Sequence, residues 1–424
     1  MPNGAATAHL LRPKLVTTFT EGYGLEGLRR DALAGLTVAI VALPLSMAIA
    51  VASGVSPERG LYTAIIGGFL VSALGGSRYQ IGGPAGAFIV LVAATVSRFG
   101  LEGLFTTVLL SGIMLALLGV LRLGSLIRHI PHAVTVGFTS GIAVTILASQ
   151  LKDLAGLTLA VEPGPFLPKM AALIGAAPSV NPAALLLGGG VAAAIFALRA
   201  WRPNWPGMLI AVAAASLLAL ALGLPVQTIG SRFGGLPQAL PAPAWPDLSL
   251  PRLMALAPAA LSFTLLGAVE SLLSAKVADG MTGRAHRSNM ELVAQGVANV
   301  ASALFGGIAV TGTIARTATN IRAGARSPVS GMLHAAYLML FILVAGPLAT
   351  YVPLSALAGV LVVVCWNMAE KAEFVRLLKG WRTAVVLLTT FGVTLLRDLT
   401  FGILAGCLAA ALLAGFDWVR SRKA

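Results

Sequence analysis

The fold of this chain is decided by the stretch GGIAVTGTIARTA, residues 306–318. Its first seven residues form a glycine-rich run that we expect to be extended. The helical segment that follows, residues 313–325, is too short to cross ~30 Å of hydrocarbon, because a helix rises only about 1.5 Å per residue. We therefore expect a half-strand that enters the membrane and a half-helix that leaves it.

A matching interruption, GGSRYQIGGP at residues 75–84, precedes a second short segment at residues 85–96. Extended backbone at membrane depth is tolerated only when it is buried in protein or lines a cavity. The run VSALGG at 71–76 echoes ASALFGG at 301–307, seven spans later. Because seven is an odd number of membrane spans, the second repeat has the opposite orientation in the membrane to the first. Paired interruptions of this kind indicate a transporter binding site, although glycines can also serve only close helix packing.

The composition places the chain in a membrane. Of 424 residues, 57% are hydrophobic and 10% are charged, and the net charge is +14. The basic excess lies in short loops between apolar segments, which is typical of membrane topology rather than of nucleic-acid binding. Fourteen apolar segments are expected, at 33–52, 61–74, 85–96, 104–121, 133–150, 184–198, 208–222, 256–275, 290–305, 313–325, 331–349, 354–368, 384–396 and 401–419.

Charge predicts the orientation. With the N-terminus in the cytoplasm, 21 Lys and Arg residues fall inside and 7 outside, as cytoplasmic loops of membrane proteins require. We therefore expect a bacterial inner-membrane protein with both termini in the cytoplasm and with no cleaved signal peptide. The proline-rich loop at 223–252 is expected to be an extracellular connector without chemistry.

The ends of the half-helices are the first candidate site. A helix N-terminus presents free N–H groups and a partial positive charge, so two such ends near the midplane can bind an anion. The residues concerned are Pro84, Ala85 and Gly86 in the first half-helix and Thr313, Ile314 and Ala315 in the second. Thr311 and Thr313 can add hydroxyl donors.

One basic and one acidic residue are expected deep within the membrane. Arg316 is one turn into the tenth segment, where it can attract the anion or form a structural salt bridge. Glu270 lies inside the eighth segment, with Ser274 on the same helix face. This pair can bind a coupling proton or sodium ion; alternatively, Glu270 serves as a structural partner of Arg316.

Other features predict no chemistry. Cys365 and Cys407 lie in apolar runs, so neither a disulfide nor a metal site is expected. Ser288 and Glu291 have the spacing of a capping box. No metal-ligand spacing is shared by His129, His132, His286 and His334, and Arg397 and Asp398 are expected to be a pair in an exposed loop. No cofactor is expected.

The chain resembles the SulP family of anion transporters over nearly its whole length. The first block of motifs is DxxAGLTV at 31–38, LPxxMA at 43–48, GLY at 60–62 and GP at 83–84. The second, more specific block is ELxxQGxxN at 291–299, FGG at 305–307, TG at 311–312, RTA at 316–318, Asn320 and AGAR at 323–326.

The resemblance implies an all-α membrane fold of two inverted seven-span repeats, with half-helices and short strands at segments 3 and 10. After a cytoplasmic segment (1–30), a core of spans 1–4 (31–122) and 8–11 (254–349) would move against a gate of spans 5–7 (126–225) and 12–14 (354–419). Residues 226–253 would form the extracellular loop. An elevator-type cycle, a homodimer within membrane lipid, and sulfate, bicarbonate, chloride or dicarboxylate substrates are also implied.

By position, the anion would contact Ala85, Gly86, Ile314, Ala315 and Arg316, with Leu45 and Ile49 nearby. Glu270 matches an acidic position that binds sodium in relatives with aspartate there.

Three departures from the family pattern follow. Leu45 replaces a residue that is polar in many members, and glutamate at 270 favours proton over sodium coupling. The family usually continues into a cytoplasmic STAS domain, whereas this sequence stops at residue 424; either the domain is naturally absent or the sequence is truncated.

The leading hypothesis is a secondary active anion transporter coupled to H⁺ or Na⁺, and a passive anion channel or exchanger on the same fold is the alternative. A nucleobase–cation symporter has a similar architecture, but the RTA motif and the block that begins at Glu291 argue against it. An enzyme is not expected, because the sequence has no nucleophile–base pair, metal cluster or nucleotide loop.

Overall fold

The structure is a computed structural model that describes residues 11–421, apart from residues 125–130, 160–162, 164, 204 and 398. Helices dominate this part of the chain. The elements of the first half are α2 (Lys14–Thr20), α3 (Leu25–Ala52), α4 (Pro57–Tyr62), the π-helical turn η1 (Thr63–Gly67), α5 (Gly68–Leu74), β1 (Gly82–Gly83), the 3₁₀ turn η2 (Gly86–Phe88), α6 (Ile89–Val120), α7 (His132–Ala155), α8 (Phe166–Gly175), η4 (Ala177–Ser179), α9 (Pro182–Trp201) and α10 (Gly207–Ala221).

The second half repeats the pattern. Its elements are α11 (Ile229–Phe233), α12 (Leu250–Thr282), α13 (Ser288–Leu304), β2 (Thr311–Gly312), α14 (Ile314–Arg322), α15 (Val329–Ala345), η5 (Gly346–Tyr351), α16 (Leu354–Met368), α17 (Lys371–Leu378), α18 (Trp381–Leu396) and α19 (Leu399–Ser421).

All fourteen expected apolar segments coincide with helical elements. Seven helices of the described residues are long and apolar enough to cross a membrane, and α10, α18 and the apolar part of α19 are shorter apolar helices. The two strands lie immediately before the third and tenth segments. The expected all-α membrane architecture of two interrupted repeats is therefore confirmed.

The third and fourth segments form one helix, α6, which bends at Gly100. The backbone there has φ 70° and ψ −176°, far from helical values. A residue without Cβ adopts positive φ at little cost, so glycine permits this break. The first part of α6 is the expected half-helix, and the second part is the next span.

Four short helices were not predicted: α2, α8, α11 and α17. The buried residues of α8 are Lys169 and Leu173, whereas Leu167 and Ile174 are exposed. Sequence reasoning missed these helices because none of them has the apolar length of a membrane span.

The two repeats pack against each other through α6 and α13, where glycines allow close backbone contact. A Cβ atom at Gly296 would lie 2.5 Å from the carbonyl oxygen of Gly112, and one at Gly119 would lie 2.6 Å from the carbonyl oxygen of Asn289. Small residues of this kind are common where membrane helices cross. These glycines therefore join the halves that carry the two strands.

Most of the contacts between helices fall within two sets, which α3 and α16 join by packing against each other. One set contains α3, α5, α6, α12, α13, α14 and α15, and the other contains α7, α9, α16, α18 and α19. The expected limits of the core and gate domains remain a prediction, and residues 1–10, 126–130, 160–162, 164, 204 and 398 of the expected segments lie outside the described residues.

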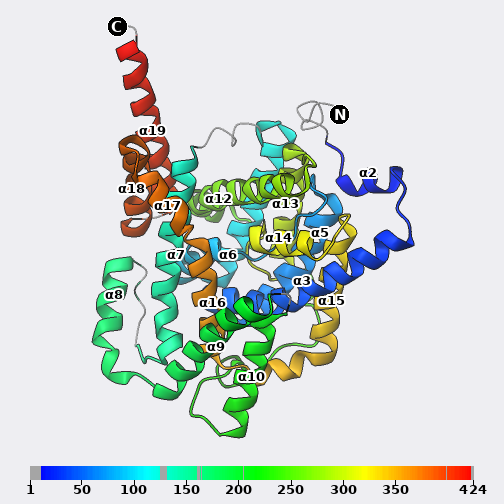
Figure 1. Ribbon diagram of the computed structural model, residues 1–424, viewed down its shortest axis with the longest axis vertical. Coiled ribbons are helices and arrows are strands. Elements are labelled where there is room, and N and C mark those ends of the chain that lie inside the picture. Colours follow the sequence, from blue (N-terminus) through cyan, green and yellow to red (C-terminus); the bar gives the residue numbers. More distant parts are fainter. Residues whose placement is uncertain are drawn as a thin grey trace.

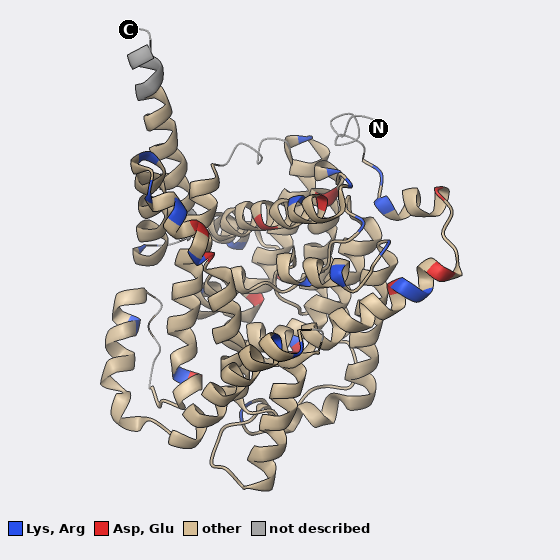
Figure 2. Ribbon diagram, in the orientation of Figure 1, with Lys and Arg blue, Asp and Glu red and all other residues tan. Residues whose placement is uncertain are grey.

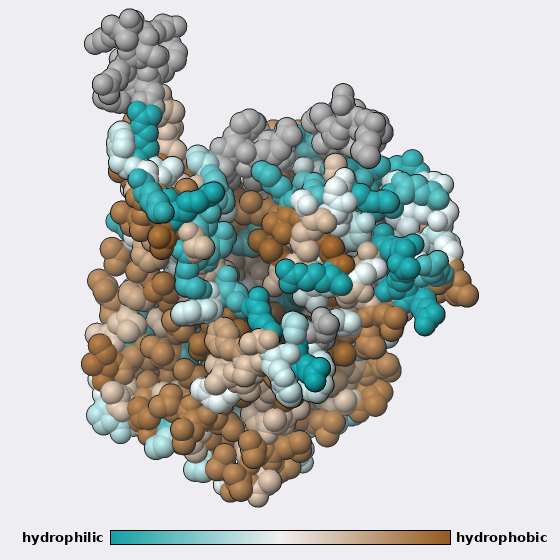
Figure 3. Space-filling view, in the orientation of Figure 1, coloured by the Kyte–Doolittle hydropathy of each residue, from teal (hydrophilic) through white to brown (hydrophobic). Residues whose placement is uncertain are grey.

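Figure 1 shows α2 and α19 extending toward the same end of the molecule. Lys and Arg residues gather toward that end, and few are found at the opposite end, near α10 (Figure 2). Apolar residues cover most of the lower part of the face in Figure 3, as a surface in contact with lipid requires.

Candidate functional site

The two sequence interruptions meet as a pair of short strands. β1 and β2 are antiparallel, with Gly82 opposite Gly312 and Gly83 opposite Thr311. The pairing continues into the next residue, because the N–H of Thr313 donates to the carbonyl oxygen of Ile81 at 3.0 Å. Each strand thus satisfies backbone groups of the other where water is scarce.

A helix N-terminus follows each strand. Helical structure begins at Gly86 after Ala85 and at Ile314 after Thr313, and neither N-terminus has a side-chain cap. Because the first turn of a helix has no internal partners for its N–H groups, both ends retain free donors. Ile314 is 37% exposed, so the second end is accessible. Two uncapped ends of this kind favour a bound anion.

Arg316 lies beside these ends and is only 1% exposed. Its Nη2 donates to the carbonyl oxygen of Pro84 at 2.9 Å. Among the described residues, its Nε and Nη1 have no hydrogen-bond partner, and no carboxylate forms an ion pair with it. A buried charge without a counter-ion is unfavourable by several kcal/mol. The site therefore carries an uncompensated positive charge.

Gly83 makes room for this guanidinium. Its φ is +154°, and a Cβ atom there would lie 2.3 Å from Arg316 Nη1. On the partner strand, a Cβ atom at Gly312 would lie 1.8 Å from Gln80 Nε2. Both strands thus need glycine where they pass polar side chains.

Helix α12 holds the second strand and half-helix by hydroxyl contacts. Ser271 Oγ lies 2.8 Å from Thr311 Oγ1, and Ser274 Oγ lies 3.2 Å from Thr317 Oγ1. The hydroxyl of Thr313 donates to the carbonyl oxygen of Ile81 at 3.2 Å. The hydroxyls expected to contact anion or coupling ion, those of Ser274, Thr311 and Thr313, are therefore all hydrogen-bonded to protein groups.

Glu270 lies on α12 in the same region and is 9% exposed. No hydrogen bond or ion pair joins it to another described residue, so the structural pair with Arg316 that the sequence left open is not formed. Glu270 is therefore a buried acidic group without a fixed partner.

Apolar residues complete the surroundings of the first half-helix. Leu45 and Ile49 of α3 are buried in the same apolar cluster as Ala85. A Cβ atom at Gly86 would lie 3.8 Å from Ile146 Cδ1 and 4.0 Å from Val364 Cγ1. Sequence reasoning missed Ile146 and Val364, because nothing distinguishes them from other apolar residues of α7 and α16.

Each repeat also supports the interruption of the other. Thr63 Oγ1 accepts a hydrogen bond from the N–H of Ile308 at 2.7 Å. In the other half, Glu291 Oε2 accepts from the N–H groups of Gly76 at 2.9 Å and Ser77 at 3.1 Å. The expected capping box is wrong, because the α13 N-terminus lacks a side-chain cap and Glu291 reaches the first interruption instead.

The described histidines do not form a common site. His132 pairs with Glu373 at 2.8 Å and His286 with Asp279 at 2.6 Å. His334 is fully buried, and neither of its ring nitrogens has a hydrogen-bond partner in the part of the chain that the structure describes. His129 and Asp398 lie outside the described residues.

Known proteins are similar to this chain in sequence. Residues 28–391 match the model of the sulfate permease family. The chain is 43% identical over 393 residues to the putative sulfate transporter YvdB of Bacillus subtilis, which covers 92% of this chain and 74% of that protein. It is 30% identical to the bicarbonate transporter BicA of Picosynechococcus, over 92% of this chain and 70% of that protein.

Solved structures of related proteins have a similar fold. The transmembrane domain of a cyanobacterial BicA superposes with a TM-score of 0.79 at 29% identity, over 92% of this chain and 98% of that chain. The structure of SLC26A9 superposes with a TM-score of 0.88 at 20% identity, over 97% of this chain and 69% of that chain, which bears on the fold alone. This chain belongs to the sulfate permease family and is a multi-pass membrane anion transporter, not an enzyme.

Proposed function

We propose that the chain is a secondary active transporter of a small oxyanion or carboxylate, with sulfate, bicarbonate and C4-dicarboxylates as the candidate substrates. The single observation that carries the proposal is Arg316, whose buried guanidinium has two donor nitrogens without a partner and no carboxylate pair among the described residues. An anion at the neighbouring helix ends would neutralise this charge. Relatives named as sulfate and bicarbonate transporters support the substrate class.

The anion would lie between the N-termini that begin at Gly86 and Ile314. It would receive backbone N–H groups from both ends and a charged hydrogen bond from Arg316. Leu45, Ile49 and Ala85 would cover it without offering hydrogen bonds. A site built mainly from backbone donors accepts several oxyanions, which is why we extend the candidates beyond sulfate.

Glu270 would couple transport to a proton or a sodium ion. It is buried, it lies on the helix that holds β2, and no described residue compensates its charge. Glutamate at this position favours the proton, because a single buried carboxylate is neutralised by protonation without further ligands. Ser274 would orient this region through Thr317 rather than bind the ion alone.

Alternating access would proceed as an elevator. The contacts that build the site lie within the expected core, whereas Ile146 and Val364, which face Gly86, belong to the expected gate and are apolar. An apolar contact can slide without breaking buried hydrogen bonds. We further propose a homodimer in the plasma membrane with both chain ends in the cytoplasm, in keeping with the basic residues near α2 and α19 (Figure 2). A passive channel or exchanger remains the alternative.

Uptake into proteoliposomes tests the proposal. Radiolabelled sulfate, bicarbonate and fumarate would be offered under an imposed proton gradient, an imposed sodium gradient, and no gradient. We expect concentrative uptake of one or more anions that depends on one gradient. Uptake that only equilibrates would favour a channel or exchanger, and the absence of uptake for every anion and gradient would refute a transporter of these substrates.

A further inference from the structure

The junction between α2, the first interruption and the start of α13 carries basic side chains that lie outside the proposed transport site. The backbone N–H of Lys14 donates to the carbonyl oxygen of Gly75 at 2.9 Å, and that of Arg287 donates to the carbonyl oxygen of Gly76 at 2.9 Å. Helix α2 and the N-terminus of α13 therefore meet at two neighbouring residues of the segment that leads to β1. Lys and Arg residues gather at this end of the molecule (Figure 2).

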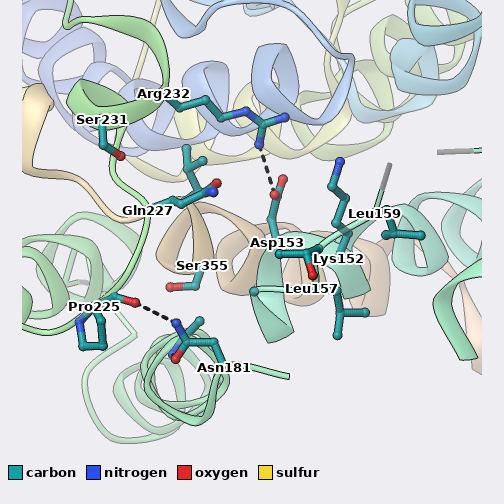
Figure 4. Close-up of a pocket in the computed structure, with 14 residues that line it drawn as sticks. Lys152, Asp153, Leu157, Leu159, Asn181, Pro225, Gln227, Ser231, Arg232 and Ser355 are labelled. Carbon is teal, nitrogen blue, oxygen red and sulfur yellow. Dashed lines mark hydrogen bonds and ion pairs between the residues drawn. The ribbon is translucent and has the colours of Figure 1, made fainter. Parts of the chain in front are cut away.

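Arg287 is the buried cation of this junction. It is 6% exposed, and its Nη1 donates to the carbonyl oxygen of Arg12 at 2.7 Å and to Thr17 Oγ1 at 3.0 Å. Among the described residues, its Nε has no hydrogen-bond partner, and no carboxylate forms an ion pair with it. By contrast, Arg232, in the cavity shown in Figure 4, pairs with Asp153 at 3.1 Å. A buried arginine without a carboxylate partner is unfavourable, so Arg287 calls for an anion.

Lys14 is the second cation of the junction. Arg287 contacts the chain on either side of it, at Arg12 and at Thr17, so the ammonium and guanidinium groups belong to one small region. The Lys14 side chain is partly buried, and its Nζ forms no hydrogen bond or ion pair with a described residue. Burial, followed by the charges of Arg287 and Arg78, lowers the pKa of Lys14 to about 8. Docking of α2 therefore brings like charges together.

The carboxylates of this region already have partners. Glu21 pairs with Arg78, and Arg284 Nη1 lies 3.8 Å from the same carboxylate oxygen. Asp279 Oδ2 lies 2.6 Å from His286 Nδ1. The sequence ahead of the described residues contains neither aspartate nor glutamate. In the part of the chain that the structure describes, the two cations of the junction thus have no carboxylate of their own.

We propose that this junction binds one tetrahedral oxyanion, a phosphate or sulfate group, between Lys14 and Arg287. Its oxygen atoms would accept hydrogen bonds from the ammonium group and from the guanidinium Nε, both of which are charged donors. The group belongs either to a free oxyanion or to the headgroup of an anionic lipid. Because both residues bond to the segment before β1, the bound group would hold α2 against the first interruption.

Competitive acetylation of the lysines tests the site. The full chain in zwitterionic nanodiscs would be treated with trace acetic anhydride at pH 7 and constant ionic strength, and mass spectrometry would give the rate at each lysine. Acetic anhydride attacks only the neutral amine, so an anion that covers Lys14 and stabilises its charge slows the reaction. Phosphate and sulfate are expected to slow acetylation of Lys14 about elevenfold at ten times the dissociation constant. The rate at the exposed Lys379 should stay unchanged.

A second arm distinguishes the two sources of the phosphate group. Here the nanodiscs contain phosphatidic acid, and no free oxyanion is added. Protection of Lys14 by phosphate or sulfate in the zwitterionic nanodiscs assigns the group to a free anion, and protection only in the presence of phosphatidic acid assigns it to a lipid. Protection in neither arm, or equal slowing at Lys14 and Lys379, would overturn the proposal.

Variants then assign the protection to the junction. Arg287→Gln should weaken the protecting affinity about tenfold or more, whereas Arg287→Lys keeps the charge and should retain most of the affinity. Thr17→Val removes one hydrogen bond between α2 and Arg287 but keeps both cations, so the affinity should be nearly unchanged. Arg30→Gln is the charge-matched control, because Arg30 is an exposed residue that pairs with Glu26.

Arg316→Ala should leave the protection of Lys14 intact, because the transport site is not involved. Loss of protection in this variant would place the effect at the transport site. Equal affinities of Arg287→Gln and the unchanged chain, or equal losses in Arg287→Gln and Thr17→Val, would show that the Arg287 charge does not bind the anion. Each of these results overturns the proposal. Size-exclusion profiles identify misfolding, and the comparison of the unchanged chain with Arg316→Ala decides the outcome if Arg287→Gln does not fold.

Discussion

Arg316 of α14 donates a hydrogen bond from Nη2 to the carbonyl oxygen of Pro84 at 2.9 Å. The bond joins the second half-helix to the end of the first strand, so one cationic side chain belongs to both repeats. Its other donors, Nε and Nη1, have no described partner. One nitrogen of the guanidinium is therefore hydrogen-bonded to the protein, and the other two can donate to an anion.

Replacing Arg316 by alanine is expected to weaken anion binding. A charged hydrogen bond contributes about 1.5–3 kcal/mol, which corresponds to roughly ten- to more than a hundredfold in affinity. Isothermal titration of the purified protein with each transported anion measures the change. Arg316→Lys keeps the charge without the planar guanidinium, so its anion affinity should lie between that of the unchanged protein and that of Arg316→Ala. An unchanged affinity in Arg316→Ala would return this residue to a structural role.

Gly83→Ala is expected to reduce transport while every charge is kept. Its Cβ atom would lie 2.3 Å from Arg316 Nη1, and φ of +154° is unfavourable for alanine. The guanidinium must move away from Pro84, so affinity for the anion should fall. Gly280→Ala on α12 is the control, because nothing lies within 4 Å of a Cβ atom there. Equal uptake by the two variants would contradict the close packing of Gly83 against Arg316.

The two interruptions and their equivalent positions in the two halves could be predicted from sequence because both depend on local signals. Glycine-rich runs before short apolar segments mark where the helix stops, and the shared pattern marks the inverted repeat. The strand register, Gly82 with Gly312, could not be predicted, since it depends on how α6 and α13 pack.

Long-range polar contacts could not be predicted from the sequence either. Glu291 resembled a local cap, yet it binds Gly76 more than two hundred positions earlier in the chain. The sequence also left open a pair between Glu270 and Arg316, which the structure does not form. A spacing pattern reports on neighbours along one helix and cannot rank partners on different helices.

Glu270 of α12 and Glu291 of α13 are both buried, and we expect different effects from the same substitution. Glu291 accepts four hydrogen bonds, from Gly76, Ser77, Gln80 and Gln295, so Glu291→Gln should destabilise the fold by about 1–3 kcal/mol. Glu270 has no such partner, so Glu270→Gln should leave the melting temperature nearly unchanged. It should abolish gradient-driven uptake while anion binding persists.

Thermal unfolding and gradient-driven uptake of the two variants separate these roles. A large fall in melting temperature for Glu270→Gln would indicate a structural partner outside the described residues. Concentrative uptake that survives Glu270→Gln would refute its role in coupling. A stable Glu291→Gln protein would mean that the first interruption does not depend on this carboxylate.

Lys14 is expected to make the docking of α2 depend on pH. Its backbone N–H donates to the carbonyl oxygen of Gly75 at 2.9 Å, at the start of the first interruption. Burial, followed by the charges of Arg287 and Arg78, lowers the pKa of Lys14 from 10.5 to about 8. The undocked side chain keeps its proton up to a higher pH, so the docked state binds fewer protons between these values. Docking should therefore strengthen as pH rises from about 8 to about 10.

A nitroxide attached to Thr20→Cys, at the exposed end of α2, reports this equilibrium through its mobility. With the native cysteines replaced, the immobile fraction should grow across that pH interval. Lys14→Met removes the titrating group and should hold the fraction constant. A fraction that falls with pH, or one that responds equally in Lys14→Met, would contradict the assignment. Docking of α2 matters for transport because α2 contacts the segment that leads to β1. Arg316 donates its hydrogen bond to Pro84, directly after that strand.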